Sequence, residues 1–478
     1  MTGVRAAYTP AALVGVSIGV LCLGLTLLTE PPLGWSNEAW WVAGLGALMA
    51  ALWMTEALPL AVTALLPIVL APLLGLAPMA EVTSAYAHPL IFLFLGGFVL
   101  GLAMQRWHLH ERIALNMLAH MGATPARELA GFMLATAFLS MWVSNTATTI
   151  MMLPIALSVV AQREGERCPR YAVGLLLGIA YAASVGGIAT LIGTPPNALL
   201  AAYLSDQHGV ELGFAGWMAI GLPVSAVMLV AVWLWLGRGL GSQQEARSGA
   251  GHEVFRQRLD ELGPMSTMEK RVALVFALTA AAWVFQPLLA GRGLGLPISD
   301  TGIAMACAVL LHALPAGDHK GQRLMDWASS QRLPWGVLLL FGGGLALAGL
   351  IQSSGLAAEL ASLLQPLGGL APWVLIVAVV LMVVFLTEVT SNTATTAAFL
   401  PLLGALAVAV GLPPEALAIP AAIAASCAFM MPVATPPNAI VFASGHLRIG
   451  DMIAAGFALN LFGAAVVVVA ALLIQSAL

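Results

Sequence analysis

Charged side chains are scarce in this sequence. Only 8% of its 478 residues are Asp, Glu, Lys or Arg, whereas 60% are hydrophobic. A soluble domain is typically about a quarter charged. A soluble fold of this size could not cover its surface with so few ions, so we predict an all-α integral membrane protein. The net charge of −4 gives no indication of a nucleic-acid partner.

Cysteine is also rare, and the patterns of several enzyme classes are absent. The four cysteines have no metal or disulfide spacing and are interpreted as packing residues: Cys22, Cys168, Cys307 and Cys427. No HExxH or Walker pattern occurs. We therefore predict neither an enzyme nor an organic cofactor. The first apolar run lacks a convincing cleavage site, so we expect a membrane span there and not a signal peptide.

Long apolar runs make up most of the chain, and a crossing needs about 20 such residues. We predict eleven spans, at residues 11–29, 38–54, 59–77, 89–105, 170–192, 217–236, 270–290, 299–315, 334–350, 417–433 and 452–475. Two further runs, 131–161 and 372–410, are too long for one crossing and are interrupted by Ser-Asn-Thr. Arms of about 14 residues are too short to cross. Each run is therefore predicted to be a re-entrant hairpin with Ser-Asn-Thr at its tip.

The placement of basic residues supports the hairpins. If the N-terminus is cytoplasmic and each hairpin returns to the side it left, every Lys and Arg except Arg292 falls on the cytoplasmic side. Treating either hairpin as a full span destroys this asymmetry. The first hairpin then opens from the cytoplasm and the second from the outside, and the C-terminus lies outside a bacterial-type inner (plasma) membrane. Residues 237–269, which are polar, are predicted to be a cytoplasmic linker with some helix.

The sequence contains two copies of one unit. Residues 144–149 (SNTATT) recur unchanged as residues 391–396, an offset of 247 residues (144 to 391). The same offset relates Phe94 to Phe341 and Gly96-Gly97 to Gly343-Gly344. A second motif, TPPNA at 194–198, recurs at 435–439. After a first helix (1–37), residues 38–236 and 270–478 each hold five spans and one hairpin. An odd number of spans inverts the second unit, so we predict an inverted repeat, as in secondary transporters.

The repeated motifs have a definite chemistry. We expect helix up to about Val143 and again from about Ala147, so that the second arm presents free N–H groups to an anion. The carbonyls that end the first arm suit a desolvated cation. Two consecutive prolines in TPPNA break a helix and expose the carbonyls before it. Simple hydrogen bonding between helices and tolerated proline kinks are the alternatives, and the duplication of both motifs disfavours them.

No Lys or Arg falls in a predicted membrane core, so a bound anion must be balanced by helix dipoles and co-bound cations. This favours cation coupling. Glu388 is the one acidic residue placed deep in a hairpin arm, and its repeat counterpart is Met141. A hydrogen-bonding role and proton coupling are both open for it. The Gly-rich segments at 95–101 and 341–344 indicate close helix packing and not a phosphate loop.

Together these residues resemble the divalent anion/sodium symporter family over nearly the whole chain. The resemblance implies eleven spans, two hairpins, a homodimer, and a transport domain that moves as an elevator against a scaffold domain. It also implies co-transported sodium and a dicarboxylate substrate such as succinate, malate or fumarate, or else citrate or sulfate. A sodium-independent dicarboxylate exchanger of the same family is the alternative.

The resemblance also assigns site residues. Substrate carboxylates would be held by Ser144, Asn145, Thr146, Ser391, Asn392 and Thr393, with Thr194, Pro195, Thr435 and Pro436 closing the site. The first sodium site would use Ser140, Ser144, Asn145 and the backbone of Gly193. The second would use Thr387, the backbone of Thr390, Asn392 and the backbone of Ala434.

Overall fold

The computed structural model describes residues 9–32, 34–121, 124–163, 169–238, 240, 250–293, 297–317, 321–364 and 369–477. These residues form helices and no strand, apart from an isolated bridge between Pro315 and Arg323. The first half contains α1 (Pro10–Leu28), α2 (Asn37–Met54), α3 (Leu60–Thr63), α4 (Leu66–Leu73), α5 (Met79–Ser84), η1 (Ala85–Ala87), α6 (Pro89–Arg106), α7 (Leu109–His120), α8 (Pro125–Ser140), α9 (Asn145–Arg163), α10 (Pro169–Ile188), α11 (Pro195–His208) and α12 (Phe214–Leu236). The second half contains α13 (Ala250–Leu262), α14 (Thr267–Pro287), η3 (Leu288–Gly293), α15 (Asp300–Ala313), α16 (Trp327–Ser330), α17 (Trp335–Ser353), α18 (Leu356–Leu364), α19 (Pro372–Leu386), α20 (Asn392–Ala409), α21 (Glu415–Ala425), α22 (Pro436–Phe442) and α23 (Ile449–Ala477).

The predicted all-helical membrane architecture is confirmed, with differences in individual spans. Among the described residues, nine helices are long and apolar enough to cross a membrane. The predicted span 59–77 is divided into α3 and α4, and the predicted span 417–433 stops as a helix at Ala425. The first interruption follows from local sequence, because Pro67 and Pro72 lack an N–H group and restrict α4.

Both hairpins turn near the predicted residues, but the expected arm length was wrong. α8 has 16 residues and α9 has 19, and α9 and α20 are themselves long and apolar enough to cross. Arm length alone therefore does not identify a hairpin. The predicted position of Glu388 within a hairpin arm was also wrong. The residue lies in the turn between α19 and α20.

The break in the first hairpin lies earlier than expected. α8 ends at Ser140 and α9 begins at Asn145, so the irregular segment is 141–144. Ser144 explains the boundary because it caps α9: its carbonyl accepts the Thr148 N–H at 3.0 Å and its Oγ accepts the Ala147 N–H at 3.3 Å. A serine cap of this kind starts the helix directly after itself.

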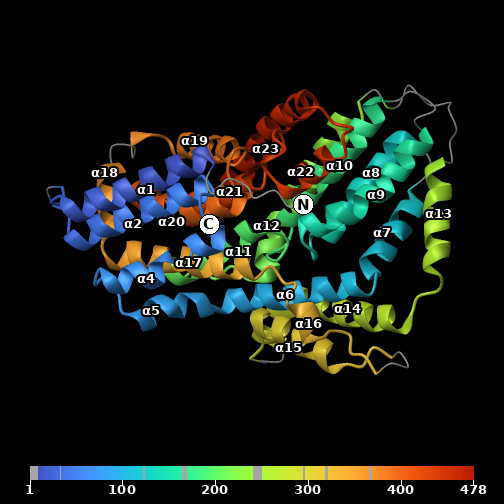
Figure 1. The fold of residues 1–478 in the computed structure, drawn as a ribbon, viewed down its shortest axis with the longest axis horizontal. Helices are drawn as coiled ribbons and strands as arrows, with labels where there is room; N and C mark the ends of the chain where they lie inside the picture. Colours follow the sequence, from blue (N-terminus) through green and yellow to red (C-terminus); the bar gives the residue numbers. More distant parts are fainter. Residues whose placement is uncertain are drawn as a thin grey trace.

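The same packing occurs in both halves of the chain (Figure 1). α10 contacts α8, α9 and α12, and α21 makes the corresponding contacts with α19, α20 and α23. The two halves also meet directly, through α9 with α22, α10 with α22, and α11 with α20. Each helix break is thereby brought against the hairpin of the opposite half.

Repeated aromatic and glycine positions on α6 and α17 allow these helices to pack closely against each other and against their neighbours. The rings of Phe94 and Phe341, equivalent in the two halves, meet edge to face with centroids 5.0 Å apart. A Cβ on Gly96 would lie 2.6 Å from the Ala304 carbonyl carbon, and a Cβ on Gly343 would lie 2.6 Å from the Ala64 Cα. The glycines therefore permit close helix packing, as predicted.

Several helices were not predicted. α7 and α18 are short and amphipathic, and α11 extends the second part of the first TPPNA motif to His208. These helices are too short or too polar to give the pattern of a membrane span. In contrast, α13 lies within the linker, where some helix was predicted, and contacts α7 and α9; linker residues 241–249 lie outside the described part of the chain.

Two ion pairs join segments that carry the predicted cytoplasmic charges. The Arg112 guanidinium lies 2.6 Å from the Glu269 carboxylate and ties α7 to α14. Arg106 at the end of α6 lies 2.6 Å from Asp326, in the segment before α17. The hydrogen bond from the Ser329 N–H, with help from Arg106, lowers the pKa of Asp326 below its ordinary value.

The glycine packing of α17 can be tested with two substitutions on one helix. Gly343→Ala drives a methyl group into the backbone at Ala64, so we expect it to destabilise the fold by about 1–3 kcal/mol, the usual cost of overpacking. Gly349→Ala is the matched control, since its Cβ meets no atom within 4 Å. The midpoint of thermal unfolding of the purified proteins measures the difference. Equal midpoints for Gly343→Ala and wild type would contradict this packing.

Candidate functional site

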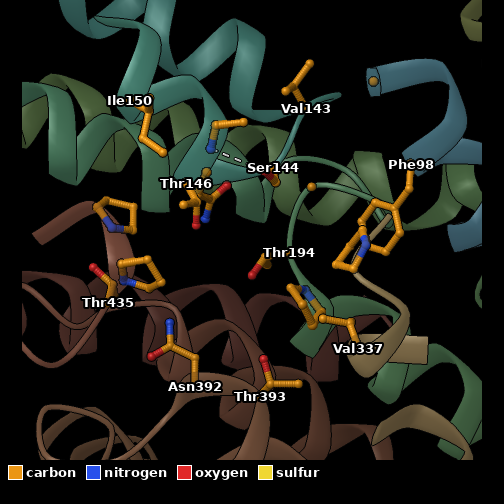
Figure 2. Close-up of a pocket in the computed structure, with 18 of the residues that line it drawn as sticks. Phe98, Val143, Ser144, Thr146, Ile150, Thr194, Val337, Asn392, Thr393 and Thr435 are labelled. Carbon is orange, nitrogen blue, oxygen red and sulfur yellow. Dashed lines mark hydrogen bonds between the residues drawn. The ribbon is translucent and has the colours of Figure 1, made fainter. Parts of the chain in front are cut away.

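A cavity of about 840 Å³ lies between the two hairpin tips (Figure 2). It is lined by every residue that was predicted to bind substrate: Ser144, Asn145, Thr146, Thr194, Pro195, Ser391, Asn392, Thr393, Thr435 and Pro436. These residues come from four separate parts of the sequence. Folding thus brings both copies of both motifs to one place.

Each group of lining residues stands at the start of a helix. Residues 144–146 begin α9, and residues 391–393 begin α20. Thr194 and Thr435 are extended residues directly before α11 and α22, which both open with Pro-Pro. The positive ends of four helix dipoles therefore face the same cavity. At α20 the Ser391 side chain makes no capping bond, so the first N–H groups of that helix are free to meet a ligand.

The two tips approach the cavity from opposite sides. Figure 2 shows Ser144 and Thr146 on one side, and Asn392 and Thr393 on the other. Thr194 lies between them, with its hydroxyl toward the open space. This arrangement offers hydroxyl, amide and backbone donors at two ends of a common space, which suits a ligand with an anionic group at each end.

A cluster of oxygen atoms lies behind the first tip. Ser140 Oγ is 2.5 Å from Asn145 Oδ1 and 2.7 Å from the Ala183 carbonyl, so its single proton can serve only one of these acceptors at a time. If the Asn145 amide is turned over, its nitrogen donates to Ser140 Oγ at 2.5 Å, to Ala183 at 3.2 Å and to the Gly193 carbonyl at 3.3 Å. Only the turned orientation satisfies the amide by hydrogen bonds, because in the other its oxygen faces only acceptors. With its nitrogen inward the group is satisfied by hydrogen bonds, and with its oxygen inward it presents an oxygen shell.

The second tip repeats this arrangement. Thr387 Oγ1 lies 2.7 Å from Asn392 Oδ1 and 3.0 Å from the Ala425 carbonyl. The Thr390 hydroxyl is occupied elsewhere, with the Leu386 carbonyl at 2.9 Å, so the side chain of Thr390 is not directed to the cluster. The backbone of Thr390 is the part that could contribute, as the resemblance implies.

The asparagine of each TPPNA motif holds its helix break together, a role that sequence reasoning missed. Asn197 Nδ2 donates to the carbonyls of Gly187 at 3.0 Å and Thr190 at 2.7 Å. Asn438 Nδ2 donates to Ala428 at 3.2 Å and Met431 at 3.0 Å. Both side chains are fully buried. Their presence in a duplicated motif was the signal that could have identified them.

The remaining cavity wall contains residues that the sequence did not single out. Apolar side chains of α6 and α17, including Phe98 and Val337, face the tips. Arg332 and Glu56 also line the cavity and are exposed. Arg332 is the one basic residue among the described lining residues, and it lies outside the membrane core in the predicted layout.

The predicted sodium ligands divide into two groups. Residues of the tips and breaks line the cavity, as Ser144, Asn145, Gly193, Asn392 and Ala434 do. Ser140 and Thr387 are fully buried behind the tips, and Thr390 is buried in the turn of the second hairpin. Ser140 and the turned-over contact to the Gly193 carbonyl meet at Asn145, Thr387 contacts Asn392, and Ala434 lines the same cavity as Asn392.

Comparison with known proteins identifies the family of this chain. A family model described as the sodium:sulfate symporter transmembrane region matches residues 11–478. The chain is 42% identical over 472 residues to the sodium-dependent dicarboxylate transporter SdcS of Staphylococcus saprophyticus, covering 96% of this chain and 91% of that protein. It is 41% identical over 471 residues to SdcS of Staphylococcus aureus strain USA300, with the same coverage.

A solved structure supports the fold. The crystal structure of the Alcanivorax borkumensis YdaH transporter matches with a TM-score of 0.63 at 16% identity, over 98% of each chain. At this identity the likeness concerns the fold alone. The family match covers almost the entire chain, and the two SdcS relatives exceed 40% identity. The chain therefore belongs to the divalent anion/sodium symporter family and is a multi-pass membrane transporter.

Proposed function

We propose that this protein is a sodium-coupled symporter of C4-dicarboxylates such as succinate, malate or fumarate. The observation that carries the proposal is the meeting of both Ser-Asn-Thr tips and both Thr-Pro breaks in one cavity. The relatives named sodium-dependent dicarboxylate transporters point to the same ion and substrate class.

Helix N-termini supply the positive potential for the anion. Each terminus is equivalent to about half an elementary charge, so four of them together approach the charge of a dicarboxylate. Because they lie at the two sides of the cavity, they would act on the two carboxylates separately. The hydroxyls of Ser144, Thr146 and Thr393 would add hydrogen bonds of the charge-assisted kind.

The oxygen clusters around Asn145 and Asn392 would hold the sodium ions. Each cluster combines a hydroxyl, an amide and a backbone carbonyl, from Ala183 within α10 and from Ala425 at the end of α21, and oxygen ligands of this kind suit sodium. Ala183 and Ala425 join the predicted ligands through their carbonyls. An ion on either asparagine oxygen would place a full positive charge beside a tip. The anion and the ions would then stabilise each other.

The two halves would form an inverted repeat with re-entrant hairpins. The matching helix contacts, and the contact between the equivalent rings of Phe94 and Phe341, support this relation. Tips that enter from opposite sides would meet at the midplane. Since Arg332 and Glu56 belong to segments with predicted cytoplasmic location, the cavity would open toward the cytoplasm in this conformation.

Alternating access would be of the elevator type, in a homodimer. The cavity lies between the two tips and a wall formed by α3, α6 and α17. That wall is apolar at Leu60, Phe98 and Val337, so the tips could slide past it without breaking ion pairs. The hairpins and breaks would form the transport domain and the wall would belong to the scaffold.

Sulfate is a second candidate substrate, because the family model carries that name. Donor groups at two opposed tips, in a cavity of about 840 Å³, favour a longer anion with two ends. Citrate also has separated carboxylates. A sodium-independent exchanger would use the same anion contacts and would need internal substrate.

Uptake into proteoliposomes tests the function. We expect succinate uptake to be driven by an inward sodium gradient, because the anion lacks a basic partner at the tips. Competition by unlabelled malate, citrate, sulfate and glutamate ranks the substrates. Uptake that is unchanged when choline replaces sodium, or that requires internal succinate, would instead identify an exchanger.

The two asparagines are tested by Asn145→Ala and Asn392→Ala. Each change removes the amide at the centre of one oxygen cluster, so we expect each to abolish sodium-dependent uptake without unfolding the protein. Asn116→Ala is the matched control, because Asn116 is exposed on α7 and its amide contacts only the Arg112 carbonyl in the described hydrogen bonds. Normal uptake by either tip variant would refute the assignment of its cluster.

The first cluster can also be perturbed from behind. A Cβ on Gly187 would lie 2.9 Å from Asn145 Oδ1 and 3.1 Å from the Gly193 carbonyl, so Gly187→Ala crowds the cluster. We expect a several-fold increase in the sodium concentration for half-maximal uptake. Gly174→Ala, on the same helix, makes only ordinary contact with the Leu236 carbonyl at 3.4 Å and serves as control. An identical sodium requirement in both variants would argue against a sodium site there.

A further inference from the structure

Glu388 is a buried carboxylate that the proposed transport cycle does not use. Its side chain is only 4% exposed, in the turn that joins α19 to α20. Oε1 accepts hydrogen bonds from the N–H of Phe429 at 2.7 Å, the N–H of Met430 at 2.9 Å and Asn460 Nδ2 at 2.6 Å. Oε2 accepts from the N–H of Met430 at 3.1 Å and of Met431 at 2.9 Å. Each of these partners is a donor.

The three backbone donors belong to the break between α21 and α22. No helical carbonyl receives the N–H groups of residues 429–431, and unpaired buried N–H groups are costly. Successive N–H groups of this kind form a concave anion-binding nest. The Glu388 carboxylate fills the nest. No ion pair among the described residues involves Glu388, so these donors, together with Asn460, balance its charge.

The carbonyl side of the same segment is fixed as well. The Tyr181 hydroxyl donates to the Phe429 carbonyl at 2.7 Å, and Asn438 Nδ2 donates to the carbonyls of Ala428 and Met431. The segment continues to Ala434, which lines the cavity. Glu388 thus sets the geometry of the break that delivers the Ala434 carbonyl.

Glu388 also lies next to Thr387, whose hydroxyl contacts Asn392. One residue therefore connects the turn that carries Thr387 with the break that leads to Ala434, which is a predicted backbone ligand of the second cation. Among the described residues, no carboxylate occupies the equivalent position in the first half. Its equivalent residue is Met141, whose carbonyl accepts the Thr190 hydroxyl at 2.5 Å, so that break is tied without a charge.

We propose that Glu388 is the positioning residue of the second cation site, holding residues 429–434 so that the Ala434 carbonyl faces Asn392. The inference rests on the proposed sodium-coupled function. Every partner of the carboxylate is a donor, so Glu388 holds the break by accepting hydrogen bonds. The effect is confined to one of the two cation sites, since the first half lacks the carboxylate.

Glu388→Gln is the direct test. The new amide turns an N–H group toward backbone N–H donors, so the break shifts and the cation site loosens. We expect the sodium concentration for half-maximal succinate uptake to rise by about 10–100-fold, the usual effect of losing an outer contact of a metal site. The succinate KM at saturating sodium should change much less. Glu388→Asp keeps the carboxylate on a shorter stem and should give an intermediate sodium requirement.

Glu128→Gln is the matched control. Glu128 is also a buried carboxylate, on α8, and receives the Tyr171 hydroxyl at 2.7 Å, but it does not line the cavity. Its variant should keep the wild-type sodium requirement. Thermal stabilisation of each purified protein by sodium alone gives a second readout that does not depend on transport. If Glu388→Gln does not fold, Glu388→Asp carries the comparison.

The outcomes separate this inference from the function on which it rests. A sodium-dependent wild type with an unchanged sodium requirement in Glu388→Gln would overturn the inference alone. Loss of a pH dependence of uptake in Glu388→Gln, with an unchanged sodium requirement, would overturn it in favour of proton transfer. A wild type that ignores sodium would overturn both the proposed function and the inference.

Discussion

One electrostatic constraint underlies the site: the tips that meet in the cavity carry no basic side chain. A desolvated dianion is costly in such a place unless fixed dipoles or cations balance it. In this fold four helix N-termini converge on one space, and two clusters of oxygens lie directly behind the tips. Binding of anion and cation would therefore be coupled by charge and by shared residues, because Asn145 and Asn392 belong to both sets.

Broken helices produce this arrangement at a cost in backbone hydrogen bonds, and the chain compensates each break locally. Ser144 caps α9, and Asn197 and Asn438 return to the carbonyls of their own breaks. Among the described residues, the second break is also held by a carboxylate, Glu388, where the first half has Met141. This difference would make the two proposed cation sites chemically unequal.

Sequence reasoning located the tips and breaks because those motifs are short, polar and duplicated within apolar runs. It could not place the ends of α8 and α9, since the cap at Ser144 depends on local geometry that apolar composition does not encode. The contacts of the Ala183 and Ala425 carbonyls could not be predicted for another reason: every residue has the same backbone carbonyl, so the sequence does not distinguish these two. The Glu388 nest required the contact with residues 429–431, which are about forty positions away and join it only through folding.

Equilibrium binding of radiolabelled succinate to the purified protein, with sodium exchanged for choline at constant ionic strength, tests the central claim most directly. If tips and ions share one site, the succinate Kd falls steeply as sodium increases, and succinate tightens sodium binding by the same factor, as linkage requires. A succinate Kd that is equal in sodium and in choline would contradict the account.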